Sequence, residues 1–234
     1  MTSDDRAHLI EIIDAARLIL LDFDGPVCSI FAGLPAPVVA ERLKSLLIAR
    51  GTHLPAEVAA LDDPLKVFRR TAEFAPDQAD MIEAALMAAE LEAAEVAELT
   101  QGIHDVIAES VATGRRVVIV SNNSEPAIKA VCDRAGFSAQ LSGIVGRPMG
   151  DPALMKPHPR PVLLACEIAE TTPKVAVLIG DSDFDMQAAG KAGSRSVGLA
   201  DSPAKAIALR NAGAEALISS MEELATALNC VGDL

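Results

Sequence analysis

The chain has 234 residues, a formal net charge of −13, and neither Trp nor Tyr. Half of its residues are hydrophobic, which is enough to bury a core and excludes an intrinsically disordered chain. The acidic balance and the scarcity of aromatic rings argue against a nucleic-acid-binding protein, because such proteins concentrate Lys and Arg and often stack bases on aromatic side chains.

The same sequence lacks the features of a secreted or membrane protein. The segment Met1–Arg6 does not have the basic character of a secretory signal, and no apolar run reaches the roughly 20 residues that span a bilayer. The four cysteines show no CxxC spacing, which is typical of small buried residues in a reducing compartment. We therefore expect a cytoplasmic protein without a membrane partner, either a monomer or a homodimer.

The first predicted element is a strand at residues 17–23, a short apolar run of the kind that is buried on both faces of a parallel sheet. No convincing strand follows from about residue 30 to residue 98. Helical patterns occupy this stretch at residues 36–50, 64–74 and 77–98. The last of them is rich in glutamates that we expect to form a solvated face, namely Glu90, Glu92, Glu95 and Glu98. This predicts a helical cap domain, residues 29–98, inserted after the first strand.

Strands and helices alternate in the rest of the chain. Strand patterns lie at residues 116–120, 175–180, 195–199 and 214–218. Helical patterns lie at residues 101–112, 125–135, 160–170, 184–192, 203–210 and 221–229. This alternation predicts an α/β fold with a Rossmann-like, doubly wound parallel sheet, formed by residues 1–28 and 99–234.

Polar side chains follow the predicted strands where each strand ends, and ligands of open parallel sheets bind at that edge. Strand alternation places Asp22 and Asp24 on the same side, where two carboxylates favour a cation or a shared proton. Ser121 opens a turn whose backbone N–H groups can face an anion. Asp181 and Asp185 follow a later strand, and such clusters of carboxylates favour Mg²⁺ over softer metals.

Together with Lys156, which lies in a proline-flanked loop, these residues resemble the four motifs of the haloacid dehalogenase-like hydrolase superfamily in order and spacing. The matching segments are Leu20-Leu21-Asp22-Phe23-Asp24-Gly25, Ser121, Lys156, and Gly180 to Asp185. The resemblance covers roughly residues 16–28 and 99–220. Pro26 departs from the family pattern, which usually has Thr or Val, but this departure removes no catalytic group.

The resemblance implies a role for each of these residues. Asp22 would be the nucleophile that forms an aspartyl-phosphate, and Asp24 would act first as general acid and then as general base. Ser121 and the backbone N–H of Asn122 would hold the phosphoryl oxygens, while Lys156 would neutralise the charge that builds on them.

The resemblance also implies a Mg²⁺ cofactor. Its ligands would be Asp22, the backbone carbonyl of Asp24, and Asp181. Asp185 would either orient a metal-bound water or pair with Lys156.

The reaction class follows from Asp24 within this resemblance, because a phosphate ester needs an acid for its leaving oxygen whereas a halide does not. The expected activity is that of a Mg²⁺-dependent phosphatase of the phosphoglycolate phosphatase-like kind, acting on a small phosphorylated metabolite beneath a helical cap. A β-phosphoglucomutase-like phosphomutase is the alternative, and a non-catalytic phosphate-sensing domain is a remote one.

Several neighbouring residues have ordinary structural explanations. Ser182 and Asp183 suit the N-terminus of a helix, and His158 suits the surface. Arg69 and Arg70 are expected to be exposed on their helix, although cap residues would select the substrate. The candidates for that selection are Arg42, His53, Lys66, Arg69 and Arg70.

Overall fold

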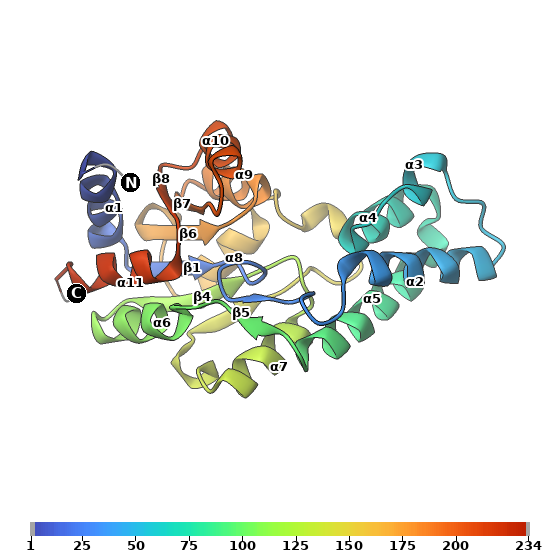
Figure 1. Ribbon diagram of the computed structural model, residues 1–234, viewed down its shortest axis with the longest axis horizontal. Helices are drawn as coiled ribbons and strands as arrows, with labels where there is room; N and C mark the ends of the chain where they lie inside the picture. Colours follow the sequence, from blue (N-terminus) through green and yellow to red (C-terminus); the bar gives the residue numbers. More distant parts are fainter. Residues whose placement is uncertain (1–2, 233–234) are drawn as a thin grey trace.

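The computed structural model describes residues 3–232 and confirms the predicted α/β fold (Figure 1). Within these residues the main sheet has six parallel strands, in the spatial order β5, β4, β1, β6, β7, β8. Their bounds are Leu18–Leu21 (β1), Arg116–Val120 (β4), Gly143–Val145 (β5), Ala176–Gly180 (β6), Arg195–Leu199 (β7) and Ala216–Ile218 (β8). The sheet is therefore doubly wound, with later strands added on both sides of β1.

Helices cover both faces of this sheet. Alternate residues of β1 face opposite layers, so the strand is apolar without interruption. Ile19 and Leu21 share one core with α1 (Ser3–Ala15), α6 (Ile103–Ala112), α7 (Glu125–Ala135) and α11 (Met221–Asn229). Leu18 and Leu20 share a second core with α8 (Arg160–Ile168) and α9 (Asp183–Ala192). Helix α10 (Pro203–Asn211) contacts β7 and β8.

The sequence patterns predict neither α1 nor β5, and there is a physical reason why each element was missed. In α1, buried Leu9, Ile12 and Ile13 have helical spacing, but charged residues dilute the pattern. Strand β5 is only three residues long and begins with a glycine. A Cβ atom on Gly143 would lie 2.6 Å from Cγ2 of Ile168, so the glycine allows α8 to pack directly on the strand.

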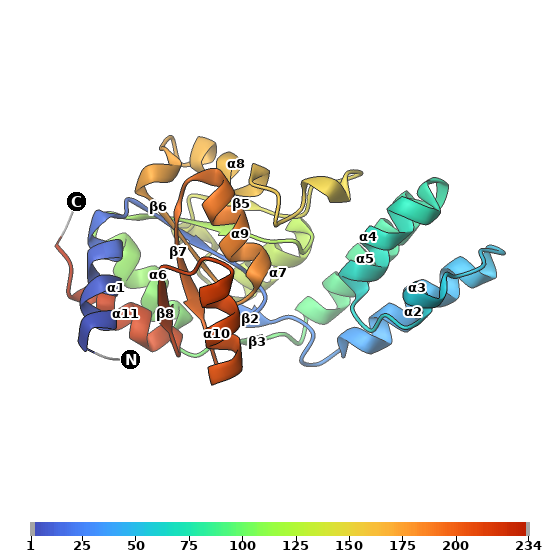
Figure 2. The same cartoon turned by 90° about the horizontal axis from the view of Figure 1, so that it is seen from above.

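The predicted helical stretch forms α2 (Ala36–Ala49), α4 (Pro64–Phe74) and α5 (Ala79–Ala94), together with an additional short helix, α3 (Ala56–Ala59). Helix α2 packs against both α4 and α5. Figures 1 and 2 show these helices at the end of the molecule opposite α1 and α11.

A short antiparallel ribbon joins the two ends of this helical segment. Its strands are β2 (Cys28–Ser29) and β3 (Glu98–Leu99), and they differ from the prediction, which has a helix through residue 98. The ribbon brings together residues 28–29 and 98–99, where the sequence divides core from cap. That division into two domains stays a prediction.

The expectation of a solvated glutamate face along residues 77–98 is wrong for one residue, which belongs to α5. Glu92, Glu95 and Glu98 are exposed, but Glu90 is completely buried. Its carboxylate is buried because Arg147, from the loop after β5, pairs with it at 2.7 Å.

Among residues 3–232, the structure has no helix with the length and apolar character needed to cross a membrane.

Candidate active site

Polar residues from three neighbouring strands meet at one edge of the sheet. Asp22 follows β1, Ser121 follows β4 and Asp181 follows β6, and these strands lie side by side and run in the same direction. The residues surround a pocket of about 200 Å³. Its lining residues are Asp22, Asp24, Asp63, Leu65, Lys66, Arg69, Ser121, Asn122, Asn123, Lys156, Asp181, Ser182 and Phe184. The structure thus brings the predicted site residues together around this pocket. Asp185 is the exception, because it is fully buried and does not line the pocket.

Lys156 forms ion pairs with two acidic residues at this edge of the sheet, Asp22 and Asp185. Its Nζ lies 2.7 Å from Oδ1 of Asp22 and 2.5 Å from Oδ1 of Asp185, and it also donates to the carbonyl oxygen of Val120 at 2.9 Å. Burial by itself lowers the pKa of Lys156, but the carboxylates of Asp185 and Asp22 outweigh burial and raise that pKa above its ordinary value. The side chain therefore carries a fixed positive charge beside Asp22.

Three carboxylates form a group that suits a divalent cation. One oxygen each from Asp22, Asp181 and Asp185 lies within 4.8 Å of the others. Burial raises the pKa of Asp22 well above its ordinary value, and repulsion from Asp185 adds to this effect. A hard cation relieves this repulsion, and oxygen ligands are those that Mg²⁺ prefers, so the donor set fits magnesium. The Asp24 carboxylate is not part of the group, and its predicted ligand atom is the backbone carbonyl.

Asp24 has an environment suited to proton transfer. Its Oδ1 accepts a hydrogen bond from the backbone N–H of Ile30 at 3.1 Å. Burial raises the pKa of Asp24 to about 6, although the hydrogen bond from Ile30 opposes the rise. A carboxyl group with a pKa near neutrality can both donate and accept a proton.

Asp185 is held by the start of α9. Ser182 is the N-cap of this helix, and its backbone N–H and hydroxyl both donate to Oδ2 of Asp185, at 3.1 and 2.6 Å. This arrangement leaves Oδ1 of Asp185 for Lys156, which is the pairing anticipated as one of its two roles. Asp183 is exposed in the first helical turn, in agreement with its structural explanation.

The loop after β4 places Ser121 and Asn122. Ser121 is buried, and its Oγ accepts a hydrogen bond from the Asn123 backbone N–H at 3.1 Å. The Asn122 side chain accepts from the backbone N–H of Lys156 at 2.9 Å and donates to the Lys156 carbonyl at 3.1 Å. Asn122 thus connects the loop after β4 to the segment that carries Lys156, a role that no sequence motif indicates.

Arg69 differs from its expected exposure. It is half-buried, donates to the Lys156 carbonyl oxygen, and lies over the ring of Phe184 with its Cζ 5.0 Å from the ring centroid. Lys66 also lines the pocket. The other candidates from the helical segment do not line it: Arg42 pairs with Glu92, Arg70 pairs with Glu57 and Glu73, and His53 is exposed.

Sequence reasoning also missed Lys205, which belongs to α10. Its Nζ lies 2.7 Å from Oδ2 of Asp181. A single lysine on a surface helix carries no motif, so only the fold reveals this contact.

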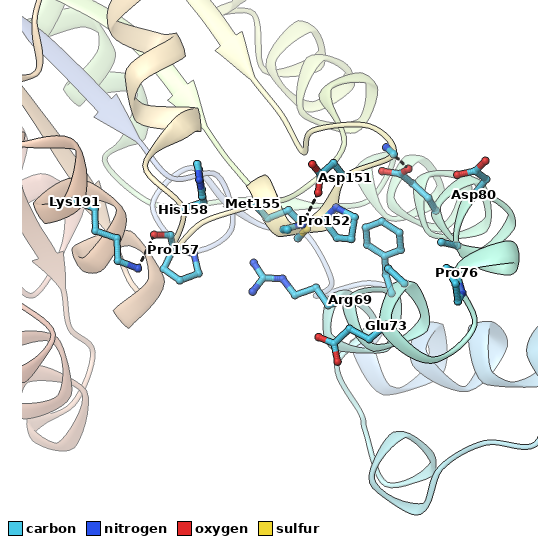
Figure 3. A pocket seen from close by; sticks show the side chains of 16 residues that line it. Arg69, Glu73, Pro76, Asp80, Asp151, Pro152, Met155, Pro157, His158 and Lys191 are labelled. Carbon is cyan, nitrogen blue, oxygen red and sulfur yellow. Dashed lines mark hydrogen bonds between the residues drawn. The ribbon is translucent and has the colours of Figure 1, made fainter.

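A larger cavity of about 610 Å³ adjoins the pocket (Figure 3). It lies between α4, α5 and the loop that precedes α8, and Arg69 lines both spaces. His158 is exposed on its rim, as expected for a surface residue.

Only glycine fits at position 25, because the side chain of Asp181 lies against its backbone. Its φ angle is +106°, and a Cβ atom would lie 2.6 Å from Cγ of Asp181. We predict that Gly25→Ala lowers the free energy of unfolding by about 1–3 kcal/mol and weakens Mg²⁺ binding, because the side chain displaces a candidate ligand. Thermal unfolding with and without Mg²⁺ measures both effects.

Gly51→Ala provides the matched control for this prediction. Gly51 has a similar φ angle of +81°, but a Cβ atom there would have no neighbour within 4 Å. We expect this variant to lose only about 1 kcal/mol of backbone energy and to keep its response to Mg²⁺. An equal loss of Mg²⁺ response in both variants would contradict the explanation.

Comparison with known proteins agrees with this geometry. The family model for haloacid dehalogenase-like hydrolase matches residues 58–199, a range that begins after Asp22. Phosphoglycolate phosphatase from Escherichia coli (strain K12) is 32% identical over 97 residues, which are 42% of this chain and 38% of that protein. Phosphoglycolate phosphatase from Aquifex aeolicus (strain VF5) is 36% identical over 83 residues, 35% of this chain and 38% of that protein. The chain therefore spans under two fifths of the length of these relatives.

Solved structures show the same architecture over almost the whole chain. CbbY from Rhodobacter sphaeroides, in complex with phosphate, is 25% identical with a TM-score of 0.67, covering 92% of this chain and 99% of that one. A predicted phosphatase from Clostridium acetobutylicum is 20% identical with a TM-score of 0.71, covering 92% and 98%. Because the family model matches more than half of the chain, the protein belongs to the haloacid dehalogenase-like hydrolase family.

Proposed function

We propose that the protein is a phosphatase that hydrolyses small phosphomonoesters through an aspartyl-phosphate on Asp22. The observation that carries this proposal is the placement of Lys156, which lies 2.7 Å from Asp22 in a pocket that also contains Asp24 and Ser121. A carboxylate can approach an anionic phosphate only where positive charge screens the repulsion, and Lys156 supplies that charge at the attacking group.

Each residue has a defined task in the proposed reaction. Asp22 attacks phosphorus, while Asp24 protonates the leaving oxygen and later removes a proton from the attacking water. Ser121 and the backbone N–H of Asn122 hold the phosphoryl oxygens as Lys156 neutralises their charge. The half-buried position and raised pKa of Asp24 support its double role.

The proposed cofactor is Mg²⁺, held by Asp22, Asp181 and the backbone carbonyl of Asp24. When bound, Mg²⁺ supplies Lewis-acid stabilisation of the phosphoryl oxygens. Asp185 remains paired with Lys156 and so keeps the ammonium group directed at Asp22.

The size of the pocket supports a small substrate. A space of about 200 Å³ can hold a phosphoryl group with a short attached chain. Two relatives named phosphoglycolate phosphatase match part of the chain, so 2-phosphoglycolate is the first compound to test.

The proposal is tested with a panel of phosphorylated metabolites, each assayed for phosphate release with Mg²⁺ and with an excess of chelator. We expect release from at least one small phosphomonoester with Mg²⁺ and a fall to the background rate with chelator. Release that is independent of metal would contradict the proposed cofactor, and the absence of release from every compound would contradict the proposed reaction. Product analysis for an isomerised sugar phosphate separates hydrolysis from phosphomutase activity.

Metal binding has a second measurable consequence. Because Mg²⁺ would bind the folded protein only, 100 times its Kd should add about 2.7 kcal/mol to the free energy of unfolding. For a chain of this size, the melting temperature should rise by about 5–10 °C. Differential scanning calorimetry with and without MgCl₂ measures the shift, and its absence would contradict a magnesium site at Asp22, Asp181 and the backbone carbonyl of Asp24.

A further inference from the structure

A buried network joins helix α5 to the loop that carries Ser121. Its centre is Arg147, whose side chain is fully buried between two acidic residues of α5. The Arg147 Nε lies 3.3 Å from Oε1 of Glu83, and its Nη1 lies 2.7 Å from Oε1 of Glu90. The guanidinium also lies over the ring of Phe68, with Cζ 5.4 Å from the ring centroid. The positive charge of Arg147 thereby offsets the desolvation cost of burying two carboxylates.

Glu90 and Glu83 have different partners beyond Arg147. Each oxygen of Glu90 accepts one bond from Arg147 and one from the loop after β4. Oε1 accepts from Asn123 Nδ2 at 3.3 Å, and Oε2 accepts from the Ser124 backbone N–H at 3.0 Å. Glu83 instead accepts from the backbone N–H of Gly150 at 2.9 Å, and both residues line the larger cavity. Of the two glutamates, it is therefore Glu90 whose carboxylate contacts the loop of the candidate active site, which Arg147 also reaches through the carbonyl oxygen of Asn122.

The contact with Asn123 determines how this residue faces Ser121. Because Asn123 donates to Glu90 through Nδ2, its Oδ1 is directed to Ser121, whose hydroxyl donates to it at 3.1 Å. The Asn123 backbone N–H donates to the same Ser121 oxygen. Ser121 Oγ is thus held in place, and its proton can turn from Asn123 to a bound phosphoryl oxygen without movement of the oxygen atom.

We propose that Glu90 is a positioning residue for phosphate binding, which acts through Asn123 on Ser121 while Arg147 neutralises its charge. This inference rests on the proposed function. It assigns a role to Glu90, a residue of the helical segment whose side chain does not line the pocket. The helical segment thereby contributes to the geometry of the phosphate-binding loop as well as to the walls of the pocket.

The experiment compares Glu90→Gln with Glu83→Gln. Each variant leaves Arg147 opposite one remaining carboxylate, so we expect similar changes in melting temperature. A carboxamide at position 90 offers one oxygen to four donors, so the Asn123 amide loses its fixed orientation. We expect Glu90→Gln to raise the inhibition constant of inorganic phosphate and the KM of the best substrate by about tenfold, with a smaller change in kcat. Glu83→Gln should leave all three near the wild-type values.

Asn123→Ala keeps the inference testable if Glu90→Gln folds poorly. Removal of the Asn123 side chain should raise the phosphate inhibition constant by a similar factor. In the Asn123→Ala background, Glu90→Gln should add little, because its effect passes through the missing amide.

The outcomes separate this inference from the proposed function. Wild-type protein that neither binds phosphate nor releases it from esters would overturn both. An active wild type in which Glu90→Gln and Glu83→Gln have equal phosphate inhibition constants would overturn only the role of Glu90. Additive effects of Glu90→Gln and Asn123→Ala would also overturn it.

Discussion

Asp22→Asn should reduce the turnover of phosphomonoesters by about 10⁴-fold or more, because an amide is not a nucleophile towards phosphorus. The substitution is nearly isosteric, and Lys156 retains Asp185 as a partner at 2.5 Å. Burial and the neighbouring carboxylates already disfavour the charged form of Asp22, so a neutral side chain should not lower the melting temperature. Phosphate release and thermal unfolding, measured on the same preparation, check both expectations.

Asp183→Asn is the matched control for this variant. Asp183 belongs to the same acidic segment as Asp181 and Asp185, but it is exposed and does not line the pocket. Its substitution should leave turnover close to that of the wild type. If Asp22→Asn retained substantial turnover while Asp183→Asn lost it, the assignment of the nucleophile would be wrong.

Arg147→Met should be the most destabilising substitution considered for this protein. Methionine preserves the apolar stem of the side chain but leaves Glu83 and Glu90 buried without a cation. Loss of one partner of a buried ion pair costs about 3–5 kcal/mol. For a chain of this length, that loss lowers the melting temperature by about 10 °C. Thermal or urea unfolding monitored by circular dichroism measures the change.

Two further variants show whether the unpaired charges cause this loss. Arg42→Met removes an exposed ion pair with Glu92 and should change the free energy of unfolding by less than about 1 kcal/mol. A triple variant with Arg147→Met, Glu83→Gln and Glu90→Gln should regain part of the lost stability, because it buries no ionised group at these positions. Equal stability of the single and triple variants would instead attribute the loss to packing against Phe68.

The principal site residues were accessible from sequence because they follow apolar strands. In a parallel sheet, the ends of neighbouring strands meet at one edge, so Asp22, Ser121 and Asp181 had to lie close together once the strand order was known. Lys156 lies on a loop, and only its match to a family motif pointed to the same place. The structure brings these four residues to one pocket, although their chemical roles remain predictions.

The contacts that sequence reasoning missed all join segments far apart in the chain. Arg69 reaches the Lys156 carbonyl oxygen, and Lys205 reaches Asp181. Glu90 resembles its exposed neighbours Glu92 and Glu95 in sequence, yet it is buried. An amphipathic pattern describes which face of a helix is apolar, but it does not reveal a guanidinium that arrives from another loop to pair with a glutamate.

The sequence by itself determined the α/β class, the helical segment between the first two strands of the sheet, and the residues at the strand ends. These properties follow from local periodicity and from the geometry of parallel strands, which any sequence of this pattern shares. Tertiary structure alone decided which charges are buried and which partners they have. The net charge of −13 describes mostly the surface. Lys156 and Arg147 are instead buried in ion pairs with Asp185 and Glu90, and the residues adjacent in sequence do not predict these contacts. A buried ion pair is stable only when the surrounding side chains and hydrogen bonds compensate for the loss of water around both charges. That surrounding exists only in the folded chain.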